Sequence, residues 1–384
     1  MDADPDRPTR PLTRRKRSPR FVEIAQAAGV SVATVNRVLN ERGSVSAETR
    51  SKVIAAAKQL GVPRLLPDPR HGLTRFDVIL AQSPTPYFSR LERALQRSAQ
   101  MLDTRIVIHR HRVDAQDEAQ LLDVIAQPRH RRDGLMVALH DSPTVRAALR
   151  AQVERGIPVV TLMSPIGDVP GLRYAGIDNL GAGRTAGHFM ARLAQPEGAP
   201  DGPGSVLMLT HSLSYRAHAE RVDGCLQVLR EQRPNWRVGP ALECLDDPDR
   251  TGLAVQRALL HARSQGLPLI GIYQSGAGSE GIARTLQAQR AQGTLRGSLT
   301  WIGHEVSDEH RLWLREGLLD LVIDQDPDGQ IVAGLHHLLH AVGYVEQPAR
   351  DEPVEFRLFC AENLRAAGTY LDAPLAAPVE RLMR

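Results

Sequence analysis

The feature that most limits the possible folds of this chain is a regular alternation of short apolar runs with stretches of helical periodicity, beginning at Phe76. Apolar runs separated by helical segments are typical of parallel strands that are buried on both faces and joined by crossover helices. The runs fall into two sets: residues 76–81, 105–110, 134–139 and 158–163, then residues 205–210, 269–273, 299–304 and 319–325. The sequence therefore predicts an α/β protein with two doubly wound parallel lobes.

The segment after the second set of runs is too short for a third domain. It predicts one helix from Asp326 onward and one strand over residues 354–360. We expect both to return to the first lobe and complete its sheet, so that crossing segments join the lobes around a hinged cleft. On this division the first lobe comprises residues 76–177 and 324–373, and the second lobe comprises residues 178–323.

Residues 21–61 predict a separate unit of three short helices. Gly29 follows the first helix, where a tight turn requires a positive φ or a close helix approach. Ser31 stands at the N-cap position of a second helix over residues 32–39. A third helix starts after Ser46, and its expected buried stripe is Val53, Ala56, Ala57 and Leu60. This order is typical of a helix-turn-helix module, whose second helix enters DNA.

The second helix of this unit has an inward apolar face and an outward polar face. On the outward face, the Asn36 amide and the Arg37 guanidinium are suited to bidentate contacts with adenine and guanine edges. The residues expected to read bases are Val32, Ala33, Asn36 and Arg37. The residues expected to position the module on phosphates are Ser31, Thr34 and Asn40.

The positive charge of the chain is concentrated at this end. Residues 1–75 carry 15 Lys and Arg against 7 Asp and Glu, a net charge of +8 in a chain whose total is +4. Residues 1–20 are rich in Pro and Arg without an apolar period, which predicts a disordered basic arm. The arm either adds nonspecific phosphate contacts or is a solvated tail. Residues 62–75 contain three prolines and are expected to form a linker.

The stretches AGVSVATVNRVLN and VSAETRSKVIAAAKQLG closely resemble the DNA-binding headpiece of the lactose-repressor (LacI/GalR) family. The resemblance continues at IDNLGAGRTAGH and HAERVDGCLQVL in the body. It implies a sequence-specific transcriptional regulator, usually a repressor, that binds a palindromic operator in double-stranded DNA as a homodimer. It also implies a body like that of the type I periplasmic sugar-binding proteins, with a small-molecule effector bound between the lobes.

Two features of the DNA-binding end depart from the family pattern. The A-R-x-L-like motif of the family's hinge helix is absent from the linker, where Leu65 or Leu66 are the remaining candidates for a minor-groove wedge. Position 36 is usually Ser or Thr in the family, so Asn36 predicts a different operator sequence. The DNA-binding role is therefore expected to be retained with an altered specificity.

Candidate effector residues follow the apolar runs, because ligands of open α/β sheets bind outside the carboxyl ends of the strands. These candidates are Tyr87, Phe88, His140, Asp141, Glu305, Gln325 and Asp326. The family resemblance adds Arg221 and also places Glu305 and Gln325 at effector-contact positions. The alternative for each is a surface or interlobe salt bridge. The segments PTPYF, GAGSEG and IGHE favour a sugar or sugar derivative over a purine as effector.

A competing interpretation comes from Gly276, Gly278 and Gly281, which satisfy the G-x-G-x-x-G pattern between a strand and a helix. It would make the protein a NAD-dependent cytoplasmic oxidoreductase. The pattern lies deep in the second lobe, whereas the dinucleotide fingerprint normally opens the first βαβ unit. A plain sugar-binding protein is the other alternative, but it would need a signal peptide and no headpiece.

The remaining composition favours a non-enzymatic cytoplasmic protein. Cys225, Cys244 and Cys360 are scattered without metal-ligand spacing, and no catalytic motif stands out, so we expect no metal, no cofactor and no disulfide framework. His109 and His111 lack a third nearby ligand. No stretch reaches the roughly 18 apolar residues of a membrane span, so no membrane association is expected.

Overall fold

The computed structural model describes residues 21–40, 45–60, 62, 73–114, 117–196, 202–294 and 299–364. The chain divides into two compact units between Leu73 and Thr74. The predicted basic arm at residues 1–20, the linker prolines with Leu65 and Leu66, and residues 365–373 of the predicted first lobe all lie outside the described residues.

The first unit consists of three helices: α1 (Phe21–Ala28), α2 (Val32–Leu39) and α3 (Ala47–Gln59). The predicted turn and cap are confirmed, since Gly29 has a φ of 65° and the Ser31 hydroxyl accepts a hydrogen bond from the Thr34 backbone N–H at 3.1 Å. Leu60 was wrongly expected in the core; it is 38% exposed because α3 ends one residue before it. The core comprises Ile24, Ala25, Val35, Val38, Leu39, Val53, Ile54, Ala56 and Ala57.

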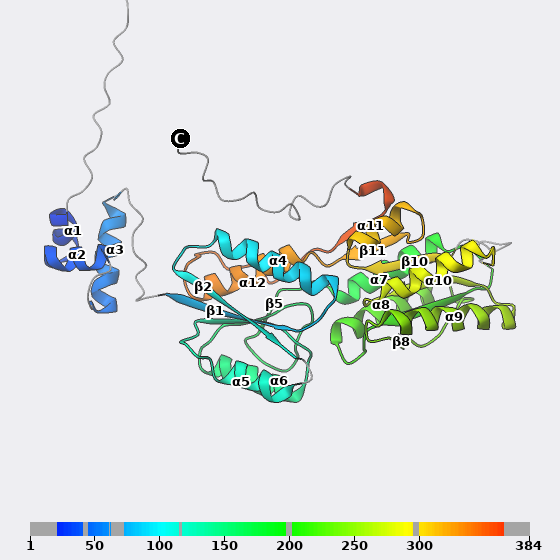
Figure 1. Cartoon of the computed structure of the whole chain (residues 1–384). Helices are drawn as coiled ribbons and strands as arrows, with labels where there is room; N and C mark the ends of the chain where they lie inside the picture. The colour runs from blue at the N-terminus through cyan, green and yellow to red at the C-terminus, as the bar shows by residue number, and fades with distance from the viewer. Residues whose placement is uncertain are drawn as a thin grey trace, which may run out of the picture. The chain divides into compact units, whose positions relative to one another are not determined.

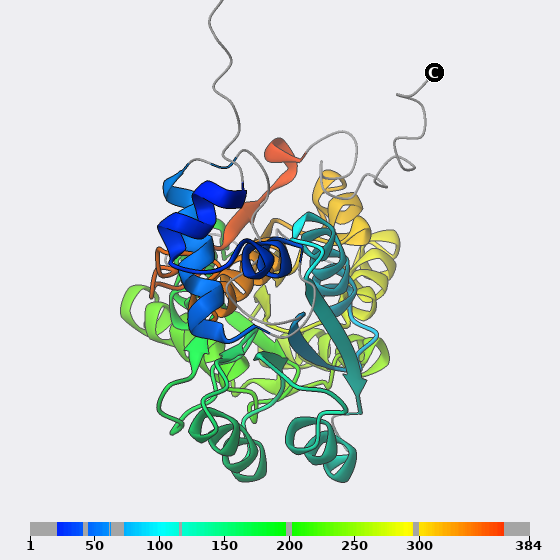
Figure 2. The same cartoon turned by 90° about the vertical axis from the view of Figure 1, so that its left-hand side faces the viewer.

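The first lobe contains a five-stranded, wholly parallel sheet in the order β2-β1-β3-β4-β5, as predicted. Helices α4 and α12 pack on one face, and α5 and α6 pack on the other (Figures 1 and 2). The strands are β1 (Thr74–Ala81), β2 (Ile106–Val113), β3 (Gly134–Ala138), β4 (Val159–Thr161) and β5 (Arg173–Tyr174). The helices are α4 (Pro86–Met101), α5 (Glu118–Ala126), α6 (Pro143–Glu154) and α12 (Pro327–Ala341).

The second lobe contains a sheet in the order β12-β11-β10-β9-β6-β7, with β8 also paired to β6. Its core strands β6, β9, β10 and β11 are parallel, which confirms the second doubly wound lobe. The strands are β6 (Ser205–Thr210), β7 (Arg237–Val238), β8 (Leu242–Glu243), β9 (Leu269–Gln274), β10 (Thr300–His304), β11 (Leu321–Asp324) and β12 (Arg357–Phe359). The helices are α7 (Asn179–Leu193), α8 (Arg216–Gln232), α9 (Pro248–Gln265), α10 (Ser279–Ala291) and α11 (Asp308–Arg315), with a short 3-10 turn at Ala361–Asn363.

The predicted return of the last strand to the first lobe is wrong. Helix α12 does pack on the first sheet, but β12 pairs antiparallel with β11 at the edge of the second sheet. The reason is that the chain after α12 crosses back beside the earlier crossing segment, where Ile177 bridges Val354, and Phe356 and Leu358 then pack against the second core. The described part of this segment, residues 324–364, is therefore shared between the two lobes. None of the described helices is long and apolar enough to span a bilayer.

Candidate functional site

The predicted DNA-reading face of α2 is exposed. Asn36 and Arg37 both point away from the core that buries Val35 and Val38. The side chain of Asn40 donates from Nδ2 to the Oδ1 of Asn36, so the two predicted contact residues support each other one helical turn apart. The exposure of this face agrees with the sequence pattern, while its contacts to DNA stay a prediction.

Ser31 and Thr34 form a second pair at the start of α2. Besides its cap contact, the Ser31 hydroxyl lies 2.9 Å from the Thr34 hydroxyl. Val32 is 44% exposed and, with Ala33, extends the same outward face. All seven residues predicted to contact DNA are thus on or next to the solvent-facing side of α2. In this position they are available to a DNA groove and to the phosphate backbone beside it.

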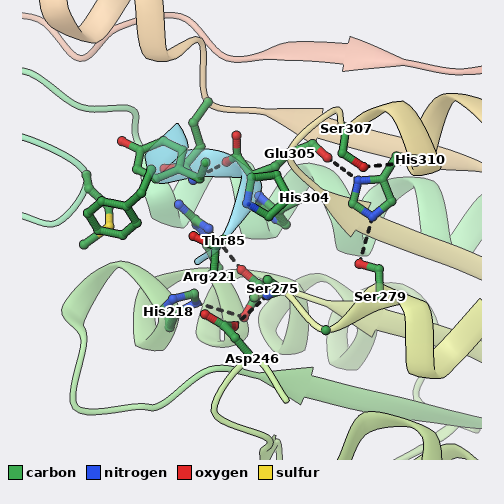
Figure 3. A pocket seen from close by; sticks show the side chains of 18 of the residues that line it. Thr85, His218, Arg221, Asp246, Ser275, Ser279, His304, Glu305, Ser307 and His310 are labelled. Carbon is green, nitrogen blue, oxygen red and sulfur yellow. Dashed lines mark hydrogen bonds between the residues drawn. The ribbon is translucent and has the colours of Figure 1, made fainter. Parts of the chain in front are cut away.

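A cavity of about 90 Å³ lies among residues that follow the strands of both sheets (Figure 3). It shares part of its wall with a wider cleft of about 480 Å³. We call these spaces the inner cavity and the outer cleft. The shared wall includes Thr85, Phe88, Met163, Tyr215, His218 and Asp246. The predicted position of a site at the carboxyl ends of the strands agrees with this arrangement.

Arg221 lies at the wall of the inner cavity and is only 2% exposed. Helix α8 carries it against α7 because the two helices cross with their backbones almost in contact. A Cβ atom on Gly183 would lie 2.1 Å from the carbonyl oxygen of Arg221, so only glycine fits there. The crossing is formed by the two body segments that carry the family resemblance, IDNLGAGRTAGH on α7 and HAERVDGCLQVL on α8. The crossing of these helices positions the buried guanidinium of Arg221.

The hydrogen bonds of Arg221 leave part of its guanidinium available. Its Nε donates to the side-chain oxygen of Asn179 at 2.9 Å, and its Nη1 donates to the backbone carbonyl of Ser275 at 3.0 Å. Both acceptors are neutral, so neither compensates the buried positive charge. A guanidinium has five N–H donors, which makes this side chain a strong candidate for binding the oxygens of a ligand.

Glu305 and Gln325 meet at the same cavity. Gln325 donates from Nε2 to a carboxylate oxygen of Glu305. Burial, reinforced by the neighbouring carboxylate of Asp324, raises the pKa of Glu305 to about 7, although Arg90 opposes the shift. Glu305 is therefore divided between its protonated and ionised forms near neutral pH, and it can either donate to or accept from a hydroxyl group.

Three histidines in the cavity wall were missed in the sequence. Burial lowers the pKa of His218 to about 3, that of His310 to about 4, and that of His304 well below its usual value, so all three are neutral at pH 7. The Nε2 of His304 lies 2.9 Å from the Tyr273 hydroxyl, while its buried Nδ1 has no hydrogen-bond partner among the residues that the structure describes. The only sequence signal was the position of His304 at the end of an apolar run.

The two aromatic candidates behave differently. Phe88 lines both the inner cavity and the outer cleft, where its ring is available to an apolar ligand face. Tyr87 is 5% exposed, and its hydroxyl donates to the Oε1 of Gln330 at 2.9 Å within its own lobe. Tyr87 therefore offers its ring to the inner cavity rather than its hydroxyl.

The other three candidates lie away from the inner cavity. His140 lines the outer cleft, where its ring packs against Tyr215 with 5.8 Å between the centroids. Asp141 accepts two hydrogen bonds from Arg146, at 2.6 and 2.9 Å, and Asp326 accepts one from Arg357 at 2.7 Å. Arginines thus engage both Asp141 and Asp326, and neither residue is part of the lining of the inner cavity or of the outer cleft.

The glycine-rich turn between β9 and α10 also lines the inner cavity. In this turn the backbone N–H of Ala277 donates to the carboxylate of Asp246 at 2.7 Å. A Cβ atom on Gly281 would lie 1.7 Å from the Pro248 carbonyl oxygen, so this glycine is required by helix packing. Helix contacts therefore explain the pattern without a dinucleotide. Within the described ranges, no cluster of three or more His, Cys, Asp or Glu residues is arranged to hold a metal ion.

Two family models match the chain. Residues 76–342 match the periplasmic binding protein domain, which covers more than half of the sequence. Residues 21–62 match the model described as bacterial regulatory proteins, lacI family. The division between the two compact units, at residues 73 and 74, falls in the gap between the two matches.

Curated relatives match over part of their length. The sucrose operon repressor of Pediococcus pentosaceus is 25% identical over 146 residues, which are 37% of this chain and 43% of that protein. The HTH-type transcriptional regulator GalS of Salmonella typhimurium is 28% identical over 216 residues, which are 55% of this chain and 59% of that protein. The chain thus spans about half of the length of these relatives.

Solved structures agree with the fold of the body. An ABC transporter solute-binding protein from Burkholderia graminis, in complex with D-arabinose, aligns with a TM-score of 0.65 at 19% sequence identity. The alignment covers 78% of this chain and all of the other chain. At this identity the similarity establishes the two-lobed fold and not the ligand.

Proposed function

Because this chain belongs to the periplasmic binding protein domain family and carries the DNA-binding domain of the lacI family of bacterial regulatory proteins, we propose that it is a transcriptional regulator. It binds an operator through α2 and responds to a small molecule in the inner cavity. The proposal is based on one combination of features in the same chain. The exposed face of α2 presents Asn36 and Arg37, and the other compact unit contains a cavity with polar residues around Arg221.

The regulator acts as a homodimer on a palindromic operator, most simply as a repressor in the cytoplasm. One recognition helix contacts only a few base pairs, so two copies related by a twofold axis are needed for useful specificity. The exposed α2 face supports this role, and so does the description of the curated relatives as regulators and repressors. These relatives also make an enzymatic role less well supported than a regulatory one.

The effector is a sugar or sugar derivative. The inner cavity combines the Arg221 donors, the Glu305–Gln325 pair and the ring of Phe88, which together suit a molecule with hydroxyl edges and an apolar face. The unpartnered Nδ1 of His304 adds a further polar group for a hydroxyl. The structural relative with bound D-arabinose is consistent with this class of ligand.

Two measurements test the proposal. Selection from random duplex DNA should enrich a palindromic sequence, and binding to it should weaken steeply with salt because phosphate contacts release counterions. A thermal-shift screen of sugars, polyols, sugar acids and NAD should raise the melting temperature with a sugar-like compound. No enriched operator would remove the regulator function, whereas stabilisation by NAD alone would favour the oxidoreductase.

A further inference from the structure

Arg90 connects the two lobes next to the inner cavity. It lies on α4 of the first lobe, and its guanidinium binds both carboxylate oxygens of Asp324, the last residue of β11 in the second lobe. The Nη2–Oδ1 distance is 3.2 Å, and Nη1 also lies 3.5 Å from a carboxylate oxygen of Glu305. Two parallel charge-assisted hydrogen bonds of this kind fix the relative geometry of their partners.

Asp324 occupies the point where the chain leaves the second lobe. Its carboxylate also accepts hydrogen bonds from the backbone N–H groups of Val306 and Asp326, each at 3.0 Å. One side chain therefore ties together the loop that carries Glu305, the crossing segment that carries Gln325, and Arg90 from the opposite lobe. Glu305 and Asp326 both have positive φ values, 64° and 51°, which non-glycine residues keep only when surrounding contacts hold them.

We propose that Arg90 is a positioning residue: it holds the lobes in the arrangement in which Glu305 and Gln325 face the inner cavity. The proposal rests on the inner cavity being the effector site, and it assigns the lobe contact that supports that site. An effector hydroxyl that donates to Glu305 competes with Arg90 for the same carboxylate. Binding at the cavity is thereby coupled to the contact between the lobes.

Removing the guanidinium leaves Asp324 and Glu305 side by side without their shared cation. Glu305 then gains a proton because Arg90 no longer lowers its pKa, and the Asp324 carboxylate, whose side chain is 2% exposed, loses its partner from the opposite lobe. Arg97 provides a matched control. It is also on α4 and also binds a carboxylate, that of Asp328, but α12 carries Asp328 onto the first sheet, so this ion pair does not cross between lobes.

The test measures an interlobe distance in the full-length protein. Spin labels are attached at Ala147→Cys on α6 and Gln256→Cys on α9, which are exposed positions in different lobes, in a Cys360→Ser background. The native thiols of Cys225 and Cys244 are buried. Double electron–electron resonance then compares the parent protein with Arg90→Met, Arg90→Lys and Arg97→Met.

We expect Arg90→Met to broaden the distance distribution and shift its mean, with Arg97→Met matching the parent protein. Arg90→Lys should be intermediate, because a single ammonium cannot bind both oxygens of Asp324 in a fixed plane. Identical distributions in Arg90→Met and the parent would overturn the proposal, and so would an equal shift in Arg97→Met. If Arg90→Met does not fold, a parent-like distribution in Arg90→Lys overturns it. These distances need neither operator nor effector, so failure of the proposed regulator function would show separately, in the DNA selection.

Discussion

The Nε–H of Arg221 donates a hydrogen bond of 2.9 Å to the side-chain oxygen of Asn179, and this contact joins α8 to the first residue of α7. Asn179 is 1% exposed and also donates from Nδ2 to the Tyr174 hydroxyl at 3.0 Å. The orientation of the guanidinium in the inner cavity thus depends on a residue that precedes it by 42 positions.

Replacing Asn179 with Ala should weaken both the fold and the site. A hydrogen bond to a buried charged group contributes about 1.5–3 kcal/mol, so we expect a loss of that size in the free energy of unfolding. The affinity for the sugar selected by thermal shift should fall roughly 10- to 100-fold, at about 1.4 kcal/mol per factor of ten. Urea denaturation and calorimetric titration measure the two effects. Arg192→Ala at an exposed position of the same helix is the control, and an equal loss there would contradict the prediction.

The crossing of α7 and α8 should not tolerate a side chain at Gly183. A Cβ atom there would lie 2.1 Å from the Arg221 carbonyl oxygen, so Gly183→Ala must separate the helices. Overpacking of this kind costs about 1–3 kcal/mol. A Cβ atom on Gly239 would meet no atom of the described residues within 4 Å, so Gly239→Ala is the matched control. A Gly183→Ala protein as stable as the Gly239→Ala protein in urea denaturation would be inconsistent with the close crossing.

Glu305 should make stability depend on pH in a specific direction. Its pKa is raised from 4.5 to about 7 in the folded protein, so the native state binds more protons than the unfolded state between these values. The contribution of this residue to the free energy of unfolding is therefore present below about pH 4.5 and is lost as the pH rises to about 7. Glu305→Gln should remove this loss. Denaturation midpoints of both proteins between pH 4.5 and 7, compared at equal ionic strength, check the direction of this pH dependence. Parallel pH profiles of the two proteins would refute the prediction.

Arg37 should determine base preference rather than overall attraction to DNA. Arg37→Ala is expected to cost about 1–3 kcal/mol on the selected operator and to relax the preference at one base pair. Lys52→Ala removes the same charge from an exposed position on α3 and should leave the preference unchanged. Fluorescence anisotropy on the operator and its single-base variants separates these outcomes. If both variants weakened every sequence equally, Arg37 would be a phosphate contact only.

The headpiece was predictable because its signals are local. The spacing of Val35, Val38 and Leu39 marks the buried face of α2 within eight residues, and the Ser31 cap lies directly before it. The parallel strands were predictable for a similar reason, since a strand buried on both faces has to be apolar along its whole length. Leu60 was misplaced because helix ends are set by the contacts of the last turn.

The position of the last strand and the lining of the inner cavity depend on contacts between residues that are far apart in the sequence. Nothing within residues 354–360 distinguishes an edge of the first sheet from an edge of the second, and the crossing next to Ile177 decides between them. Asp141 and Asp326 follow strand ends as effector residues do, yet neighbouring arginines engage both. The neutral histidines of the inner cavity were missed because their low pKa values arise first from burial and then from nearby charges, both of which depend on the tertiary structure.

The sequence by itself determined the elements: a three-helix headpiece with Asn36 and Arg37 outward, two parallel lobes, and Arg221 in a recognisable segment. These properties follow from spacing, capping and apolar runs, which act over a few neighbouring residues. Only the tertiary structure decided which polar side chains face the inner cavity and which join the lobes. Arg90 and Asp324 are 234 positions apart, and their ion pair exists only because two lobes bring α4 and the end of β11 to the same place.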